Sequence, residues 1–457
     1  LFTTACKRGT RARMSMEYKS HEQDADGVTT TCLDRLTGKE VKIRSKYLIG
    51  ADGGNSLVAE NEKLPIEGKM GVGGSMNILF RADLSKYVAH RPSVLYWIMQ
   101  PGADVGGIGM GLVRMIRPWN EWLIVWGYDV TQPAPKVDEA MATDVARQLI
   151  GDPELEIELL SANTWTVNDA YATQLSRGRV FIMGDAAHRH PPSNGLGSNT
   201  SIQDAFNLCW KLSSVIKKQA GETLLETYNV ERAPIAKQVV TRANQSISEF
   251  GPIFEALGMT GGTDYELIKS NMDARCGTDT KAEAQRDALN KAIAFKRYEF
   301  DAHGIEMNQR YSSNAIISDG QSEPLFDKDA VLHYQPTTWP GARLPHAWVF
   351  DASGRKHSTL DLAGGGAFSL ITGLGGEPWA VAAAEVANEL GIVIKVHVIG
   401  PRQEYVDHSG AWAAAREIRD SGCILIRPDQ HVCWRSEAMV DEPGGEIKRV
   451  LSKILAR

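Results

Sequence analysis

The chain has 457 residues, of which 43% are hydrophobic and 23% are charged, and its formal net charge is −6. These values are typical of a globular protein of two or three domains, and they lack the basic excess expected of proteins that bind nucleic acids or membrane surfaces. No run of about 18 apolar residues is present, and the N-terminal residues do not resemble a secretory signal. We therefore expect a cytoplasmic protein that binds neither nucleic acid nor membrane.

The six cysteines are scattered along the chain, without a CxxC pair or the Cys/His spacing of a zinc site. This distribution predicts free thiols and neither a disulfide framework nor a metal site.

The first 66 residues contain β-rich runs at 28–32 and 41–43, and a third apolar run at 47–51 leads into Asp52-Gly53-Gly54. Between residues 67 and 173 the pattern changes to the β-rich runs 76–80, 93–99 and 122–128, followed by a helical pattern over 137–150. This order predicts a largely antiparallel sheet with its own core. The segment is rich in tryptophan and tyrosine, and we expect core packing for most of these side chains.

Residues 178–212 are the most informative stretch of the chain. The apolar run 180–183 predicts a strand that ends at Gly184-Asp185, and Pro191-Pro192 stiffens the loop that follows. Gly195 and Gly197 allow a flat ligand to approach the backbone, and the apolar spacing predicts a helix that begins near Asn199. The N–H groups of such a helix start would face a ligand that gains negative charge, so the stretch predicts a cofactor site.

Further helices are predicted at 222–228 and 234–250, the second with Pro234 in its first turn. The Pro-rich segment 335–346 marks a connection between domains. Residues 348–457 alternate between strand and helix patterns, with a buried strand at 368–372, a helix at 379–390, a strand at 392–399, a hairpin at 423–435 and a final helix at 447–455.

Two motifs resemble those of a known family. The run GDAAHRHPPSNGLGSN, from Gly184, is similar to the second flavin fingerprint of the single-component FAD-dependent aromatic hydroxylases, and ADGGNSLV, from Ala51, is similar to their Asp-Gly motif. The C-terminal pattern resembles the thioredoxin-like domain of the phenol hydroxylase branch. The resemblance implies an α/β fold: a glutathione-reductase-like FAD-binding domain (1–66 and 174–335), an inserted mixed β-sheet substrate domain (67–173) and a thioredoxin-like domain (345–457).

That family also has a GxGxxG βαβ unit ahead of its Asp-Gly motif, and we find none in this sequence. Gly71–Gly74 and Gly106–Gly111 are glycine-rich, but their surroundings indicate turns or sheet. We therefore expect that the sequence is N-terminally truncated and that the FAD-binding domain is incomplete.

The resemblance implies a monooxygenase that hydroxylates phenols, chlorophenols among them, ortho to the hydroxyl group. It would use FAD, NADPH and O2, form a flavin C4a-hydroperoxide and release a catechol. Homodimers or larger homo-oligomers are implied as well. Two alternatives stay open: a hydroxylase of another aromatic or polyketide ring, and an inactive fragment that only dimerises.

The same resemblance assigns roles to individual residues. Pro192 would present its carbonyl to the substrate hydroxyl, and His190 is a candidate base, whereas His188 is interpreted as structural and satisfied by backbone. Trp97, Met99 and Met110 are hypothetical substrate contacts because of their place on the predicted strands. The cofactor contacts implied are Asp52, Arg179, Gly184, Asp185, Pro192, Gly195, Gly197, Ser198 and Asn199.

Overall fold

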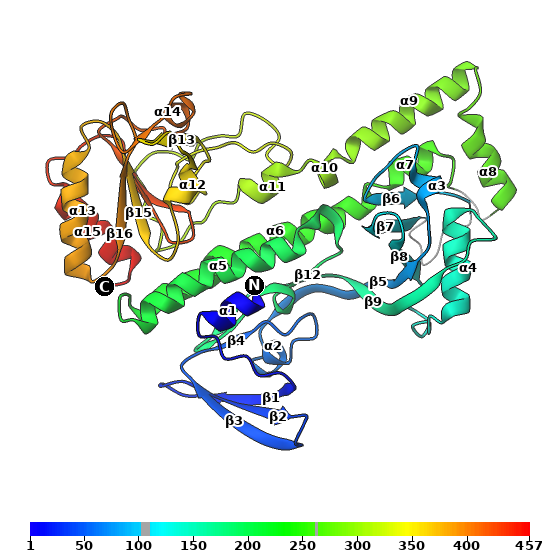
Figure 1. Ribbon diagram of the computed structural model, residues 1–457, viewed down its shortest axis with the longest axis horizontal. Coiled ribbons are helices and arrows are strands. Elements are labelled where there is room, and N and C mark those ends of the chain that lie inside the picture. The colour runs from blue at the N-terminus through cyan, green and yellow to red at the C-terminus, as the bar shows by residue number, and fades with distance from the viewer. Residues whose placement is uncertain (102–109, 261–263) are drawn as a thin grey trace.

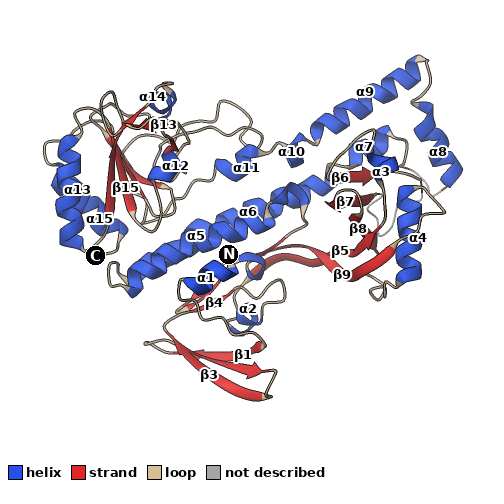
Figure 2. Cartoon of the chain, viewed as in Figure 1, coloured by secondary structure: helices blue, strands red, loops and turns tan. Residues whose placement is uncertain are grey.

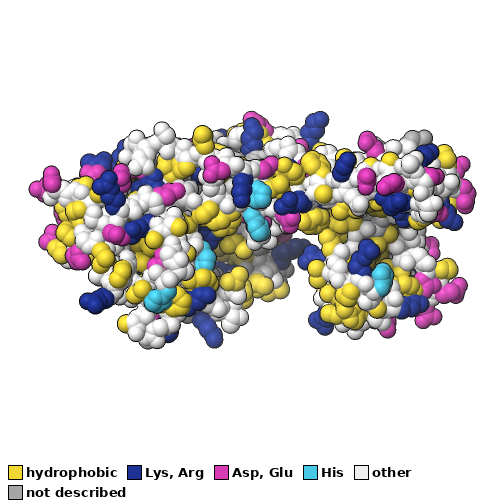
Figure 3. Space-filling view, turned by 90° about the horizontal axis from the view of Figure 1, so that it is seen from above, with side chains coloured by type: hydrophobic (Ala, Val, Ile, Leu, Met, Phe, Trp, Pro, Cys, Tyr) yellow, Lys and Arg dark blue, Asp and Glu magenta, His cyan; other side chains and the backbone are white. Residues whose placement is uncertain are grey.

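The computed structural model of the protein describes residues 1–101, 110–260 and 264–457. Figure 1 shows an elongated molecule in which the long helices α5 and α6 run through the centre, between a C-terminal α/β region and a β-sheet region. Seen from above, a notch separates the larger part of the molecule from the part that contains α8 and α9 (Figure 3). These two helices span Tyr265–Ala274 and Thr280–Phe295, and the long central pair spans Gly197–Ile216 and Glu226–Ser248.

The N-terminal region places the two sequence motifs at one sheet edge. Strand β4 (Leu48–Gly50) pairs in parallel with β11 (Val180–Ile182), and Gly50 lies opposite Ile182. Since parallel strands end at the same edge, the Asp-Gly and Gly-Asp turns emerge side by side. The other elements are β10 (Ser176–Arg177), helices α1 (Phe2–Lys7) and α2 (Leu57–Asn61), and an antiparallel sheet of β1 (Met16–Gln23), β2 (Val28–Asp34) and β3 (Lys39–Ser45).

The predicted antiparallel sheet is confirmed, with strand order β12-β9-β5-β8-β7-β6. Alternate residues of β5 and β8, such as Ile78 and Ile124, are fully buried beneath α4 and form a separate core. Gly71–Gly74 lie within β5, as predicted, and Gly106–Gly109 lie outside the described residues. The bounds are β5 Ile66–Arg81, β6 Leu95–Ile98, β7 Gly111–Arg117, β8 Glu121–Tyr128, β9 Glu158–Ala172, β12 His188–Arg189, α3 Ser85–Val88 and α4 Glu139–Ile150.

Strands β5 and β9 are much longer than their neighbours and pair along most of their length. The pairing shifts register between Lys69 and Gly73, and there the N–H of Gly71 donates to the Asn168 side chain at 2.8 Å. Beyond this bulge the ladder continues to β12, which follows directly on the Gly-Asp turn. The same two strands therefore belong to the sheet region and to the cofactor edge.

One helix prediction is wrong. Pro234 does not begin a helix but lies inside α6, and residues 222–225 form a short 3₁₀ turn before it. Tyr228, Ile235 and Val239 are buried on one side of α6, so tertiary packing outweighs the hydrogen bond that the proline removes. The shorter helices that follow are α7 (Gly251–Ala256), α10 (Arg297–Phe300) and α11 (His303–Met307).

In the C-terminal region a central sheet of order β16-β15-β18-β19 has α13 and α15 packed side by side against it (Figure 2). Strand β15 is parallel to β16 and antiparallel to β18, which is the predicted thioredoxin-like arrangement, and all six cysteines are free, also as predicted. Its core is continuous with that of α5 and α6. The elements are β13 Trp348–Asp351, β14 Lys356–Ser358, α12 Thr359–Leu362, β15 Phe368–Thr372, α13 Glu377–Leu390, β16 Ile394–Val398, β17 Tyr405–Val406, α14 Ala411–Ala415, β18 Cys423–Ile426, β19 Val432–Ser436 and α15 Pro443–Ile454.

Candidate cofactor and substrate site

Arg189 lies between the two motif turns. Its guanidinium donates to the carbonyl oxygens of Asp185 at 2.9 Å and Ala186 at 3.2 Å, and its side chain would lie 3.9 Å from a Cβ placed on Gly54. Burial lowers the pKa of Arg189, and the nearby charges of Asp185 and Asp52 oppose that shift. Sequence reasoning missed this residue, although its position between two histidines of the fingerprint was the available signal.

The two motif aspartates are both exposed. Asp52 accepts hydrogen bonds from the Ser56 hydroxyl at 2.6 Å and from the Val58 N–H at 3.2 Å, so it also fixes the start of α2. Asp185 lies in a 3₁₀ turn over Gly184–Ala186. Gly184 has φ +63°, and a Cβ there would lie 3.1 Å from the Ser201 hydroxyl, so this turn requires glycine.

Buried Asp204 of α5 holds the Gly-Asp turn in place. Its carboxylate accepts from the Gly184 N–H at 3.0 Å, from His188 Nε2 at 2.8 Å and from Arg232 Nε at 2.8 Å. Burial acts to raise the pKa of Asp204, but the His188 hydrogen bond and the Arg232 charge lower it overall. His188 was predicted to be a structural residue satisfied by backbone. It is buried, but its partner is this carboxylate, because α5 brings Asp204 beneath the turn.

The glycine loop leads into α5, which begins at Gly197, two residues before the predicted start. Helix geometry leaves the N–H groups of Gly197, Ser198 and Asn199 without acceptors inside the helix, and the last two residues are exposed. Gly195 is exposed with φ +65°, and its carbonyl accepts from the Asn199 side chain at 3.0 Å. The loop and the helix start therefore present several donors at one surface, next to Asp185.

His190 and Pro192 lie beside this surface. His190 Nδ1 lies 2.7 Å from the Pro191 carbonyl oxygen, to which it donates, and Nε2 then carries the free lone pair. Burial lowers the pKa of His190, so its imidazole is neutral at pH 7 and able to accept a proton. Pro192 is exposed, and its carbonyl accepts from the Gly195 N–H at 3.1 Å, which leaves one lone pair available.

Arg179 lies at the opposite end of β11 from Asp185. Its guanidinium donates to the Ala25 carbonyl at 2.5 and 2.9 Å and to Glu222 at 3.1 Å. Three strand residues, about 10 Å of extended chain, separate it from the Gly-Asp turn, so the structure does not bring it to the surface formed by the other residues.

The three predicted substrate contacts come together in an apolar cluster. Met110 packs with Phe250, and the Trp97 and Phe250 rings lie 4.8 Å apart. Trp97 and Met99 line an apolar cavity of about 340 Å³. Phe250 was not predicted as a lining residue because it lies more than 100 positions farther along the chain. The other lining residues come from α7, α9, α10 and their flanks and are Ile253, Ile293, Lys296, Arg297, Phe300 and Asp301.

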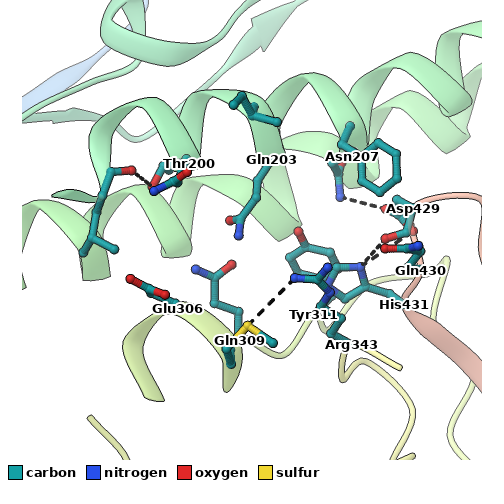
Figure 4. A pocket seen from close by; sticks show the side chains of 15 residues that line it. Thr200, Gln203, Asn207, Glu306, Gln309, Tyr311, Arg343, Asp429, Gln430 and His431 are labelled. Atoms are coloured by element: carbon teal, nitrogen blue, oxygen red, sulfur yellow. Dashed lines mark hydrogen bonds and ion pairs between the residues drawn. The ribbon is translucent and has the colours of Figure 1, made fainter. Parts of the chain in front are cut away.

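A second cavity of about 360 Å³ lies between α5 and the C-terminal region (Figure 4). Asn199 and Gln203 line it from α5, and Tyr311, stacked 4.2 Å from the His431 ring, lines the opposite side. Asn207 and Asp429 belong to the wall and also to a buried cluster of charges beneath it.

That ionic cluster consists of Lys211, Glu231, Arg427 and Asp429, all fully buried or nearly so. Arg427 donates to both oxygens of Glu231, at 2.6 and 2.9 Å, and to both oxygens of Asp429, at 3.0 and 2.5 Å. Lys211 completes it with a 2.8 Å bond to Glu231. The cluster fastens α5 and α6 to the β18–β19 turn.

No helix within residues 1–101, 110–260 and 264–457 combines the length and apolar character needed to cross a membrane. In the same residues no three His, Cys, Asp or Glu side chains are arranged to bind a metal ion.

Comparison with known proteins agrees with these features. A family model described as an FAD binding domain matches residues 1–243, and another, described as the C-terminal part of aromatic-ring hydroxylases, matches residues 337–457. The chain is 52% identical to 2,4-dichlorophenol 6-monooxygenase of Cupriavidus pinatubonensis, covering 100% of this chain and 76% of that protein. It is 48% identical to phenol 2-monooxygenase of Pseudomonas sp. (strain EST1001), over 99% of this chain and 72% of that one.

Among solved structures, the flavin-dependent monooxygenase PieE in complex with FAD and substrate superposes with a TM-score of 0.89 at 40% identity, covering 96% of this chain and 75% of that one. Aklavinone-11 hydroxylase, in a ternary complex with FAD and aklavinone, gives a TM-score of 0.78 at 26% identity, covering 100% of this chain and 76% of that one.

Proposed function

The chain belongs to the family of FAD-dependent aromatic-ring hydroxylases, and we propose that it hydroxylates a phenol at the position ortho to the hydroxyl group, with NADPH as reductant and O2 as oxygen donor. The observation that carries the proposal is the joint surface of the two motif turns and the α5 start, together with an apolar cavity lined by aromatic residues, whose α10 wall is hydrogen-bonded to the glycine loop at Asn194. Bound FAD supplies the reaction with oxygen activation. The protein's own residues supply position and charge.

The residues at this surface fit a flavin. The unpaired N–H groups of Gly197, Ser198 and Asn199 match an acceptor edge that gains negative charge, and exposed Asp185 can accept hydrogen bonds from a polyol chain. Gly195 leaves room for close approach, since a Cβ placed there would have no atom within 4 Å, Gly184 shapes the turn that carries Asp185, and Asp52 lies at the neighbouring turn. Arg189 is added to the predicted set because it binds two carbonyls of the Gly-Asp turn and lies beside Gly54 of the Asp-Gly turn. Arg179 stays a prediction, supported only by its position directly before β11.

We assign substrate activation to Pro192 and His190. The open lone pair of the Pro192 carbonyl can accept the hydrogen bond of a phenol hydroxyl, which increases electron density on the ring. His190 has a free Nε2 and is neutral at pH 7, so it can take the phenol proton. His190 Nε2 would lie 3.7 Å from a Cβ placed on Gly197, which puts the candidate base next to the helix start.

The substrate is proposed to occupy the cavity beside Trp97 and Met99, which is almost wholly apolar and large enough for a single substituted ring. An apolar wall of this kind suits chlorinated or alkylated phenols better than polar ones. We also propose the domain extents 1–66 with 174–335, 67–173 and 345–457, and a homodimer or larger homo-oligomer.

The experiment combines cofactor retention with turnover. Purified chain is passed through gel filtration with FAD, and NADPH oxidation is then followed with and without 2,4-dichlorophenol, with catechol formation measured in parallel. Retained yellow FAD and phenol-stimulated catechol formation support the proposal. A colourless protein without turnover contradicts it and favours a chain that only dimerises, whereas turnover of polyketide rings alone favours the other alternative.

A cavity-filling variant tests the substrate site. Met99→Trp should raise the KM for 2,4-dichlorophenol about tenfold or more, because about 1.4 kcal/mol of binding corresponds to that factor. Met14→Trp, at an exposed position, serves as the matched control. An unchanged KM in Met99→Trp would place the substrate elsewhere.

A further inference from the structure

Asn194, in the middle of the glycine loop, has an unusual backbone conformation. Its φ is +62° and its ψ is −6°, in the left-handed region that glycine and asparagine tolerate best. Gly195, next to it, is also left-handed. Backbone conformation alone would therefore accept a glycine at position 194, and the asparagine side chain calls for a separate explanation.

Both ends of that side chain are bonded to distant helices. Nδ2 donates to the carbonyl oxygens of Tyr298 at 2.7 Å and Glu299 at 3.2 Å, both in α10. Oδ1 accepts from the hydroxyl of Ser246, near the end of α6, at 2.7 Å. These contacts span about 50 and 100 positions of sequence, so Asn194 clamps the loop between two helices that are remote along the chain.

The same helices form the wall of the apolar cavity. The carbonyl oxygen of Ser246 accepts from Lys296 Nζ at 2.6 Å, and this ammonium group lies 3.6 Å from the centre of the Phe250 ring. Lys296 and Phe250 both line the cavity, and so do Arg297 and Phe300 on either side of the two carbonyls that Asn194 binds. Two consecutive hydrogen bonds, from Lys296 to Ser246 and from Ser246 to Asn194, thus connect the cavity wall with the glycine loop.

We infer that Asn194 is a positioning residue that couples the occupancy of the cavity to the cofactor surface. Its side chain bonds protein groups at both ends and thereby ties the Pro192–Gly195 loop to Ser246 of α6 and to two carbonyls of α10, in the wall of the cavity. A ring that enters the cavity displaces or tightens this wall, and the clamp passes that change to the loop. The inference rests on the proposed function, in which FAD binds at the loop and a phenol binds in the cavity.

The test is a linkage experiment that needs no turnover. The dissociation constant of FAD is measured by flavin fluorescence, with and without saturating 2,4-dichlorophenol, and that of the phenol by tryptophan fluorescence without FAD. In the wild-type chain the phenol should change FAD affinity about fivefold or more, within the usual range of coupling between sites. In Asn194→Gly, which keeps the backbone conformation, the factor should fall below about twofold while phenol affinity without FAD stays unchanged.

Ser246→Ala removes the α6 end of the clamp and should reduce the coupling in the same direction. Ser248→Ala is its matched control, since that hydroxyl is exposed and bonds only within α6. If Asn194→Gly does not fold, Ser246→Ala carries the test alone. Wild-type coupling in both clamp variants would overturn the inference and leave the proposed function standing, and a wild-type chain that binds neither FAD nor phenol would overturn both.

Discussion

Replacing Arg427 by methionine should be the most destabilising single change in the interface between α5, α6 and the C-terminal region. Arg427 is fully buried and makes four hydrogen bonds to the carboxylates of Glu231 and Asp429. The cluster of two cations and two anions is neutral as it stands. Without Arg427, two carboxylates face the single ammonium of Lys211, which leaves one uncompensated negative charge away from water.

Removing one partner of a buried ion pair typically costs about 3 to 5 kcal/mol, because the remaining charge keeps its desolvation penalty. We expect Arg427→Met to lower the free energy of unfolding by that amount. The assay is urea denaturation followed by tryptophan fluorescence, and Trp210, whose ring centre lies 5.2 Å from the Arg427 guanidinium, reports on the site directly.

Arg449→Met is the matched control, since Arg449 is exposed on the outer side of α15 and pairs with Glu446, three residues away. Its loss should cost less than about 0.5 kcal/mol. Adding Glu231→Gln to Arg427→Met should restore part of the lost stability, because it removes the uncompensated charge. A loss below about 1 kcal/mol in Arg427→Met, or purely additive losses in the double variant, would refute this account of the cluster.

Three further outcomes are expected. Burial lowers the pKa of Lys211 to about 8 from 10.5, so between these pH values the unfolded chain binds one proton more than the folded chain. The unfolding free energy of wild type, relative to that of Lys211→Met, should therefore rise between pH 8 and pH 10.5 by up to about 3 kcal/mol. A difference that does not change with pH would show that Lys211 is not desolvated. Asp204→Asn should weaken FAD binding about tenfold in fluorescence titrations, because the Gly184 N–H and Arg232 lose a charged acceptor, and Asn168→Ala, in strand β9, should not. In the wild-type protein the rate of hydroxylation should fall at acidic pH, below pH 6.5, because burial lowers the pKa of His190. This fall should disappear in His190→Gln. If the variant keeps the wild-type pH profile, His190 is not the base.

The local order of the cofactor site could be predicted from sequence because each piece carries a local signal. A short apolar run predicted the strand that begins at Val180, and the Gly-Asp pair predicted where this strand ends. The apolar spacing of 3.6 residues predicted the helix that follows Gly197. That the two fingerprints meet at one sheet edge, through the parallel pairing of β4 with β11, came from the structure.

The contacts that fix this site could not be predicted in the same way. Asp204 and Lys211 lie on a helix face that otherwise packs against the core. A charged residue in such a pattern indicates that it has a buried partner, but the pattern does not show which residue that partner is. The partners, Arg232 and Glu231 on α6 and Arg427 in the C-terminal region, are chosen by tertiary packing. Pro234 shows the reverse case, in which packing overrides a strong local signal.

The ladder between β5 and β9 limits how the substrate region can move. Because the same two strands reach from the sheet core to β12, no sliding surface separates that sheet from the cofactor edge. Relative motion has to come from bending of the paired strands themselves. We expect the bend at the irregular pairing between Lys69 and Gly73, where glycines interrupt the ladder and the Gly71 N–H donates to the Asn168 side chain instead. We therefore expect the two strands to bend continuously around this bulge, and we do not expect two rigid domains to rotate about a hinge.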